Sequence, residues 1–126
     1  MRTSLAAVVA AAIALAGCGA SSGGKGRTVT VEAGGPVTVT AHEYRFDPKT
    51  IVAGGGSPLT LTLRNGGSLA HDLRVRRGGR DVGGTGIFTP GQSQTVRLSL
   101  PPGSYQFLCT VGDHAQLGMR GTLVVK

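Results

Sequence analysis

The stretch Leu59-Thr60-Leu61-Thr62-Leu63 alternates strictly between an apolar and a polar residue. Successive side chains of a β-strand point to opposite faces, so this alternation predicts a strand with one face on a core and the other in water. A short apolar piece at 51–52 and several further segments read in the same way, namely residues 28–31, 37–40, 71–76, 96–100, 104–109 and 121–125.

Groups of glycine and proline separate these segments, as in Gly34-Gly35-Pro36 and Pro101-Pro102-Gly103. Such groups supply the turns that join antiparallel strands. No sustained apolar helical repeat follows the N-terminal region. The sequence therefore predicts an all-β fold, a Greek-key sandwich or barrel of about seven to eight strands. Residues 77–89 are rich in glycine without clear periodicity, and we expect a long loop there.

The N-terminus has the features of an export signal. Arg2 precedes an apolar run from Leu5 to Ala16, which is too short to span a bilayer because a spanning helix needs about 20 apolar residues. Leu15-Ala16-Gly17-Cys18 resembles the bacterial lipobox, in which the cysteine is acylated and becomes the new N-terminus. The alternative is an ordinary signal peptide with an incidental cysteine. We expect residues 1–17 to be a lipoprotein signal peptide and Cys18 to be lipidated.

A linker and one domain are expected after the signal. Residues 18–27 are small, polar and rich in glycine, which is typical of a flexible tether. The folded domain is expected over residues 28–126. Two acyl chains hold a protein stably on a membrane, so we predict a lipid-anchored protein. We expect it to be extracytoplasmic, on the outer face of the cell membrane, which is in the periplasm where the cell has one.

The net charge is +7, from 13 basic and six acidic residues. Such a surface could favour anionic lipid headgroups or an acidic protein partner, but a solvated surface without a specific partner is the simpler interpretation. We expect no nucleic acid as a partner, because the basic residues are scattered and the chain is expected to be exported. We expect a monomer.

Three residues that bind soft metal ions lie close together near the C-terminus. Cys109, His114 and Met119 fall within eleven residues at the spacing C-x4-H-x4-M, and His71 lies upstream. If Cys18 is acylated, Cys109 has no intramolecular disulfide partner, and an odd thiol in an exported protein needs an explanation. A thiolate, two imidazoles and a weak thioether suit one copper ion that cycles between Cu(I) and Cu(II), as in blue-copper sites.

Each of these residues also has a purely structural interpretation. A buried cysteine such as Cys109 is often a small core residue, and Met119 could fill space in the core. His114 could be a loop histidine and His71 a structural one. His42 lies in an alternating strand away from the motif, and we interpret it as a surface or core residue.

The segment YQFLCTVGDHAQLGMRGTL at 105–123 resembles the copper loop of the cupredoxins, the family of plastocyanin and azurin, whose small bacterial members often read Y-x-F-x-C-x-V-P-G-H-x-x-x-G-M-x-G-x-L. Residues 43–48 and 61–65 are also similar to segments of that family. Gly112 and Asp113 stand where proline and glycine are usual. The resemblance extends from about residue 37 to 125, and it implies a cupredoxin fold with one copper on His71, Cys109, His114 and Met119.

The resemblance also implies roles for neighbouring groups. The backbone N–H of Asp72 would bond the cysteine sulfur and tune the thiolate, although an ordinary strand residue is an equal alternative. The edge of His114 would be the point at which electrons leave. The expected function is a blue copper protein that carries single electrons to and from an unidentified, membrane-bound redox protein.

Other functions compete with electron transport. A copper-binding or delivery protein without a redox role would use the same ligands. A metal-free sandwich would leave the spacing of Cys109, His114 and Met119 unexplained. An enzyme is not expected, because the sequence has no His-x-His pair for a trinuclear copper centre and only one cysteine in the loop.

Overall fold

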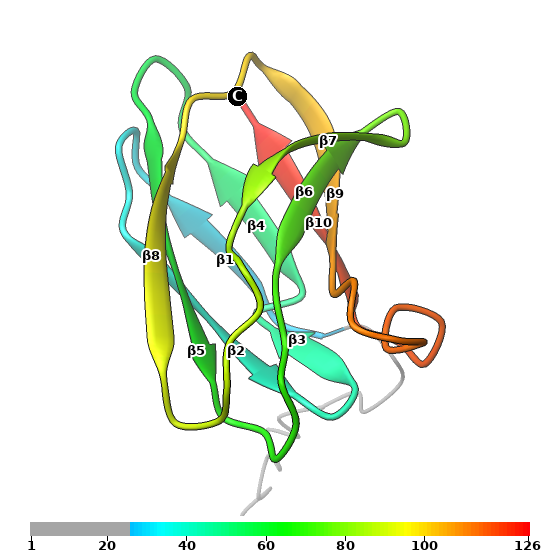
Figure 1. The fold of residues 1–126 in the computed structure, drawn as a ribbon. Coiled ribbons are helices and arrows are strands. Elements are labelled where there is room, and N and C mark those ends of the chain that lie inside the picture. The colour runs from blue at the N-terminus through cyan, green and yellow to red at the C-terminus, as the bar shows by residue number, and fades with distance from the viewer. Residues whose placement is uncertain (1–25) are drawn as a thin grey trace, which may run out of the picture.

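The computed structural model describes residues 26–126, and these form two β-sheets packed face to face (Figure 1). The larger sheet has six strands in the order β1 (Thr28–Val31), β4 (Thr50–Ala53), β10 (Arg120–Val125), β9 (Gly103–Leu108), β6 (Arg74–Arg77) and β7 (Arg80–Gly84). The smaller sheet has four strands in the order β3 (Arg45–Asp47), β2 (Val37–His42), β5 (Leu59–Asn65) and β8 (Ser93–Leu98). The expected all-β sandwich is confirmed.

Alternation along the strands builds the core between the two sheets. In β5, Leu59, Leu61 and Leu63 are buried while the threonines between them are half-buried. Val37, Val39 and Ala41 of β2 fill the same layer, and the pair β2–β5 is parallel. The opposite sheet contributes side chains that are also fully buried: Ile51, Val75, Phe107 and Leu123. Each apolar side chain buried in this way stabilises the fold by roughly 1.5–3 kcal/mol relative to leaving it in water.

The described residues contain two strands, β3 and β7, that the alternation did not predict. The expected loop over residues 77–89 is wrong for Arg80–Gly84, which pairs with β6 as β7. Gly84 has a φ of +141°, and a Cβ there would collide with the Leu73 carbonyl oxygen, so only glycine fits this close approach. A glycine-rich strand shows no apolar alternation, which explains why the pattern did not reveal it.

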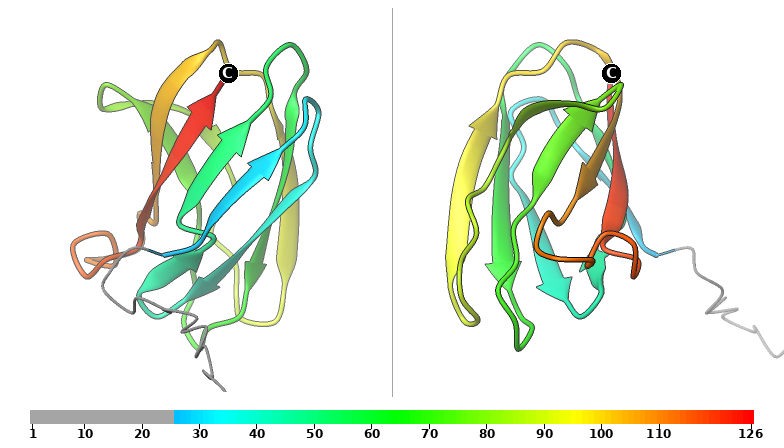
Figure 2. Two further views of the ribbon diagram at one scale, coloured as in Figure 1. Left: turned by 180° about the vertical axis from the view of Figure 1, so that it is seen from behind. Right: turned by 45° about the vertical axis from the view of Figure 1, so that its right-hand side comes forward.

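One end of the sandwich carries the loops that matter for function. The loop between β9 and β10, drawn in orange, lies at the same end as the β2–β3 turn and the segment that follows β5 (Figure 2). The predicted strand at 71–76 begins later than expected, at Arg74, and His71 instead forms an isolated bridge with Phe88. Within residues 26–126, the chain has no helix long and apolar enough to cross a membrane.

Candidate metal centre

The ends of β9 and β10 place two of the sulfur-containing side chains next to each other. Leu108 pairs with Arg120 at the last rung of this antiparallel ladder. One residue beyond it, the Cys109 N–H donates to the Met119 carbonyl at 3.1 Å. Both side chains are completely buried and belong to the main hydrophobic core. The sheet therefore fixes where these two side chains enter the site.

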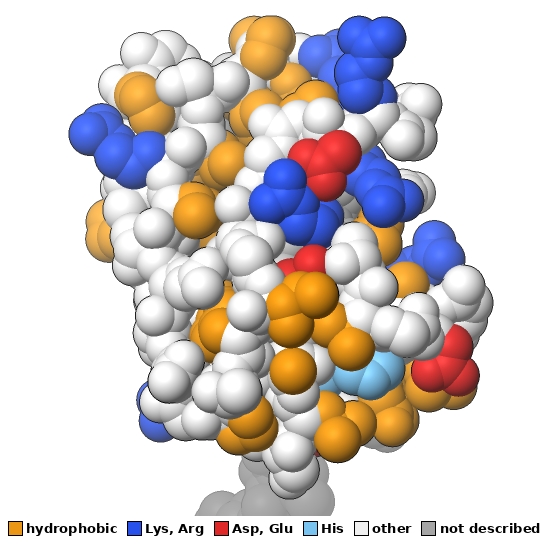
Figure 3. Space-filling model, in the orientation of Figure 1, with side chains coloured by type: hydrophobic (Ala, Val, Ile, Leu, Met, Phe, Trp, Pro, Cys, Tyr) orange, Lys and Arg blue, Asp and Glu red, His pale blue; other side chains and the backbone are white. Residues whose placement is uncertain are grey.

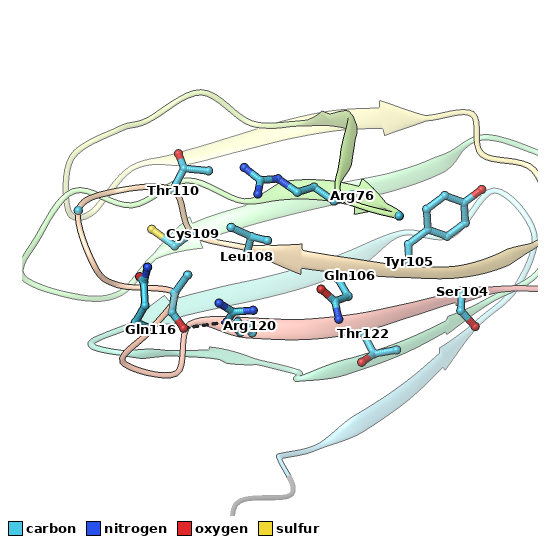
Figure 4. A pocket seen from close by; sticks show the side chains of 14 residues that line it. Arg76, Ser104, Tyr105, Gln106, Leu108, Cys109, Thr110, Gln116, Arg120 and Thr122 are labelled. Atoms are coloured by element: carbon cyan, nitrogen blue, oxygen red, sulfur yellow. Dashed lines mark hydrogen bonds between the residues drawn. The ribbon is translucent and has the colours of Figure 1, made fainter.

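A tight turn carries His114 back toward Cys109. The His114 N–H donates to the Val111 carbonyl, and the Met119 N–H donates to the His114 carbonyl, both at 3.1 Å. Gly112 has a φ of +47°, so glycine at this position suits the turn although the resembling family usually has proline. The turn is also fixed from outside, because Arg120 Nε donates to the Ala115 carbonyl at 2.9 Å (Figure 4).

His71 is held by a bridge to Phe88 and by a buried asparagine. The His71 and Phe88 backbones exchange two hydrogen bonds of 3.2 and 3.1 Å. The Asn65 side chain donates to the carbonyls of Leu69 and Phe88 and accepts from the Gly67 N–H. In the sequence, Asn65 looks like part of a simple turn, and nothing in the local pattern indicates that it braces the segment leading to His71.

Three donor atoms converge at this end of the sandwich. The Cys109 sulfur lies 3.8 Å from His71 Nδ1 and 3.6 Å from His114 Nδ1, and the three donor atoms all lie within 4.8 Å of one another. All three residues are buried, and the two imidazole rings are 5.0 Å apart. A buried thiol facing two ring nitrogens is the donor set that suits copper, so the residues fit this metal. His42, at the end of β2, is not part of this group.

The environment of Cys109 acts on its thiolate in two directions. Burial raises the pKa of the thiol, and hydrogen bonds from the backbone N–H groups of Asp72 and Val111 lower it; the net pKa is above the usual value. The uncomplexed thiol is therefore protonated at neutral pH, and metal binding must release that proton. The Asp72 carboxylate accepts from the Thr110 N–H at 2.6 Å and from the Thr110 hydroxyl, which fixes the residue after the cysteine.

Glu43, just after β2, is a site residue that the sequence did not single out. Its Oε1 accepts from His71 Nε2 at 3.1 Å and from the backbone N–H groups of Ser68 and Leu69 at 2.7 and 2.8 Å. Burial favours the neutral acid, but these bonds outweigh it and lower the pKa of Glu43 to about 2. The contact joins residues 28 positions apart, so no local motif could show it.

The rim of the site is apolar on one side. Tyr44, Leu69, Ile87 and Leu117 have exposed fractions of 37, 43, 59 and 52%, and we call these four residues the apolar rim. The Tyr44 ring lies 5.0 Å from that of His114, which is only 7% exposed. Hydrophobic side chains gather around a histidine at the lower end of the face in Figure 3. This part of the rim is therefore an exposed apolar surface.

The other side of the ligand loop borders a polar groove of about 760 Å³. Arg76 of β6 and Arg120 of β10 line it on either side of β9, with Leu108 and Gln106 between them (Figure 4). Among the described residues, no Asp or Glu lines this groove. The two sides of the metal loop therefore differ in chemistry. The His114 ring lies beside Tyr44 of the apolar rim, and His114 is not one of the residues that line the groove.

Comparisons with known proteins support the fold. The profile of the cupredoxin-like domain family matches residues 5–125. No curated protein matches the sequence significantly. Solved structures similar to the fold include a dithionite-reduced auracyanin from the photosynthetic bacterium Roseiflexus castenholzii, with 24% identity and a TM-score of 0.69 over 75% of this chain and 98% of that chain.

Two further structures show how widely this fold is shared. Rusticyanin from Thiobacillus ferrooxidans has 21% identity and a TM-score of 0.66, over 81% of this chain and 86% of that chain. A copper-containing nitrite reductase from Thermus scotoductus SA-01 has 22% identity and a TM-score of 0.56, over 72% of this chain but only 22% of the reductase. At these identities the structures show similarity of fold.

Proposed function

The chain belongs to the cupredoxin-like domain family, and we propose that it is an extracytoplasmic type 1 copper protein that carries single electrons between redox partners. One observation supports this most directly. The buried Cys109 sulfur faces the Nδ1 atoms of both His71 and His114, within 4.8 Å for the whole group. These are the ligands of a blue-copper site.

In this proposal, Cys109, His71 and His114 would hold one copper ion, and Met119 would be a weaker fourth ligand. Bound copper supplies a one-electron couple between Cu(I) and Cu(II). The protein contributes a rigid frame, because each ligand is tied to a strand end or a backbone bridge. A frame that allows little ligand movement suits electron transfer, in which both oxidation states share one site. The Asp72 N–H at the sulfur would tune that couple.

Electrons would enter and leave through His114. His114 is the most exposed of the three residues, at 7%, while His71 and Cys109 are wholly covered. The apolar rim around it offers a weak, short-lived docking face for a redox protein. Such a face favours turnover over tight binding, since small interfaces of this kind suit transient electron-transfer encounters.

Membrane attachment through Cys18 is part of the proposal and rests on the lipobox-like sequence, which lies outside the described residues. A protein held at the membrane in this way would meet membrane-bound redox enzymes. That partner is proposed as a class, a redox protein on the outer face of the membrane.

Copper delivery is the alternative use of the same ligands. Delivery requires ligands that a partner can reach and replace one at a time. Here Cys109, His71 and Met119 are completely buried, which favours retention of the metal. A multicopper oxidase is also disfavoured, because within residues 26–126 this is the only cluster of three or more close metal-binding side chains. A multicopper oxidase needs a second copper centre.

The decisive experiment is a titration of the purified protein with Cu(II). We expect an intense blue or green colour from thiolate-to-copper charge transfer and a reversible one-electron response at a positive potential. Cys109→Ser should remove the colour. His42→Gln is the matched control, because it changes a histidine outside the cluster and should leave the colour unchanged. A wild-type protein that stays colourless would exclude the proposal, and colour without reversible cycling would favour delivery.

A further inference from the structure

Glu43 gathers three N–H donors on a single carboxylate oxygen. Oε1 accepts from His71 Nε2, from Ser68 N and from Leu69 N. The nearby Gly67 makes this possible, because a Cβ at that position would overlap the Glu43 carboxylate. The carboxyl is only partly covered, with 27% of the side chain exposed, whereas the His71 ring is fully buried.

We propose that Glu43 is a positioning residue that holds His71 in the tautomer required for metal binding and makes its ring a stronger electron donor. The inference rests on the proposed function, since it concerns a ligand of the same copper. It adds a residue that the ligand pattern does not contain.

The hydrogen-bond geometry fixes the position of the ring proton. A neutral imidazole carries one N–H, and Oε1 already receives two backbone N–H groups, so it acts toward His71 as an acceptor. The proton must then sit on Nε2, which leaves the lone pair of Nδ1 directed toward the Cys109 sulfur, 3.8 Å away. In the opposite tautomer, the lone pair of Nε2 would face a lone pair of Glu43 Oε1. The proton would then sit on Nδ1, and this atom could not bind a metal.

The negative charge has a second effect. A carboxylate that accepts from the remote nitrogen of a ligating histidine raises the basicity of the ring, and partners of this kind typically contribute 10- to 100-fold to metal affinity. A more basic imidazole favours Cu(II) over Cu(I), because the higher charge gains more from electron donation. Glu43 should therefore lower the reduction potential of the site.

The bonds to Ser68 and Leu69 suggest a competing explanation. Glu43 could be only an anchor for the segment between β5 and His71, which Asn65 also braces. In that case the charge of Glu43 would not affect metal binding, and the tautomer of His71 would not depend on Glu43. The test must therefore separate loop anchoring from an effect on the ring.

Two substitutions make this separation. Glu43→Gln keeps an acceptor oxygen of the same shape and removes the charge, while Glu43→Ala removes both. Asp113→Asn is the matched control, because it removes one negative charge from an exposed side chain next to His114 in the sequence, whereas the ring of His71 contacts Glu43 and that of His114 contacts Cys109.

The first measurement uses the metal-free protein, so it does not depend on copper binding. Nitrogen-15 NMR of the imidazole rings should show His71 protonated on Nε2 in the wild type, in Glu43→Gln and in Asp113→Asn. Glu43→Ala should lose this single tautomer. A wild-type ring protonated on Nδ1, or a tautomer that persists in a folded Glu43→Ala, would refute the positioning role.

The second measurement compares affinities. Glu43→Gln should weaken Cu(II) binding by about 10- to 100-fold, weaken Cu(I) binding less and so raise the reduction potential, and it should weaken Zn²⁺ binding as well. Effects equal to those of Asp113→Asn would show that Glu43 is an anchor alone. If Glu43→Ala does not fold, Glu43→Gln decides the question. If the wild-type protein binds no copper, the proposed function fails while the tautomer and Zn²⁺ results still stand.

Discussion

The Cys109 N–H donates to the Met119 carbonyl at 3.1 Å, one residue beyond the last rung of the β9–β10 ladder. The sheet therefore reaches into the metal centre, and the two sulfur-containing side chains start from neighbouring, hydrogen-bonded backbone positions. The imidazoles are held differently, His114 by a turn between these strands and His71 by its bridge to Phe88.

Met119→Leu tests whether Met119 would act as a ligand. The side chain is fully buried in the core, and leucine has nearly the same volume, so the free energy of unfolding should fall by less than about 1.5 kcal/mol. The copper protein should stay coloured because Cys109 remains. Its reduction potential should rise, since an apolar group replaces a weak donor that stabilises Cu(II). Voltammetry and absorption spectra check this, and an unchanged potential would mean that Met119 only fills space.

Leu117→Glu tests the apolar rim. Leu117 is 52% exposed and lies in the same loop as His114, so a charge there should slow electron self-exchange by about tenfold or more while the spectrum and potential stay close to wild type. Val82→Glu is the matched control, because Val82 of β7 is 37% exposed and lies outside the rim. Equal rates in the two variants would show that the rim is not the docking face. NMR line broadening in mixtures of the oxidised and reduced protein measures the rate.

Gly121→Ala tests the packing between β10 and the core. A Cβ at Gly121 would overlap the Phe107 ring and the Lys49 carbonyl oxygen, and neither can retreat easily. Overpacking of this kind should lower the free energy of unfolding by about 1–3 kcal/mol in urea denaturation. Gly86→Ala is the control, because its added methyl group would meet only the Gln94 side chain at 3.9 Å. Similar stabilities for the two variants would contradict the packing account.

The ion pair between Asp81 and Arg74 gives a pH dependence with a definite sign. Hydrogen bonding to Arg74 lowers the pKa of Asp81 below its ordinary value of 3.8. The pair therefore stabilises the fold above that pH, and its contribution is lost as the pH falls through the lower pKa of the folded state. Both side chains are partly exposed, so the contribution should stay below about 1 kcal/mol.

Asp81→Asn measures this contribution. The free energy of unfolding should differ between wild type and variant at pH 7, and the difference should shrink as the pH is lowered below about 4, the ordinary range of an aspartate pKa. Urea denaturation at several pH values checks this. A difference that grows toward low pH would reverse the predicted sign.

The parts of the molecule that could be predicted from the sequence are those whose signal is local. Strict alternation marked β5 and β2, and the compact spacing of Cys109, His114 and Met119 indicated a metal site. β7 was missed because its glycines carry no apolar pattern, although they fit backbone positions where a Cβ would collide. The contacts of Glu43 and Asn65 could not be predicted, because each depends on how distant segments pack.

The register of β1 determines which end of the molecule faces its attachment point. Thr28 lies level with Thr50, and Thr50 with Thr122, so the chain enters the sheet beside the base of the orange metal loop (Figure 2). A lipid on Cys18 would therefore tether the molecule by its copper-bearing pole. Only nine residues, 19–27, separate Cys18 from the start of β1.

Such a short connection would keep the metal centre near the membrane surface. Partners embedded in the membrane could then reach the metal centre more easily than proteins in the surrounding solution could. Lengthening the linker with Gly-Ser repeats should speed oxidation of the membrane-held protein by a soluble acceptor. The point at which one short strand begins would thus help to decide which partners can exchange electrons with the site.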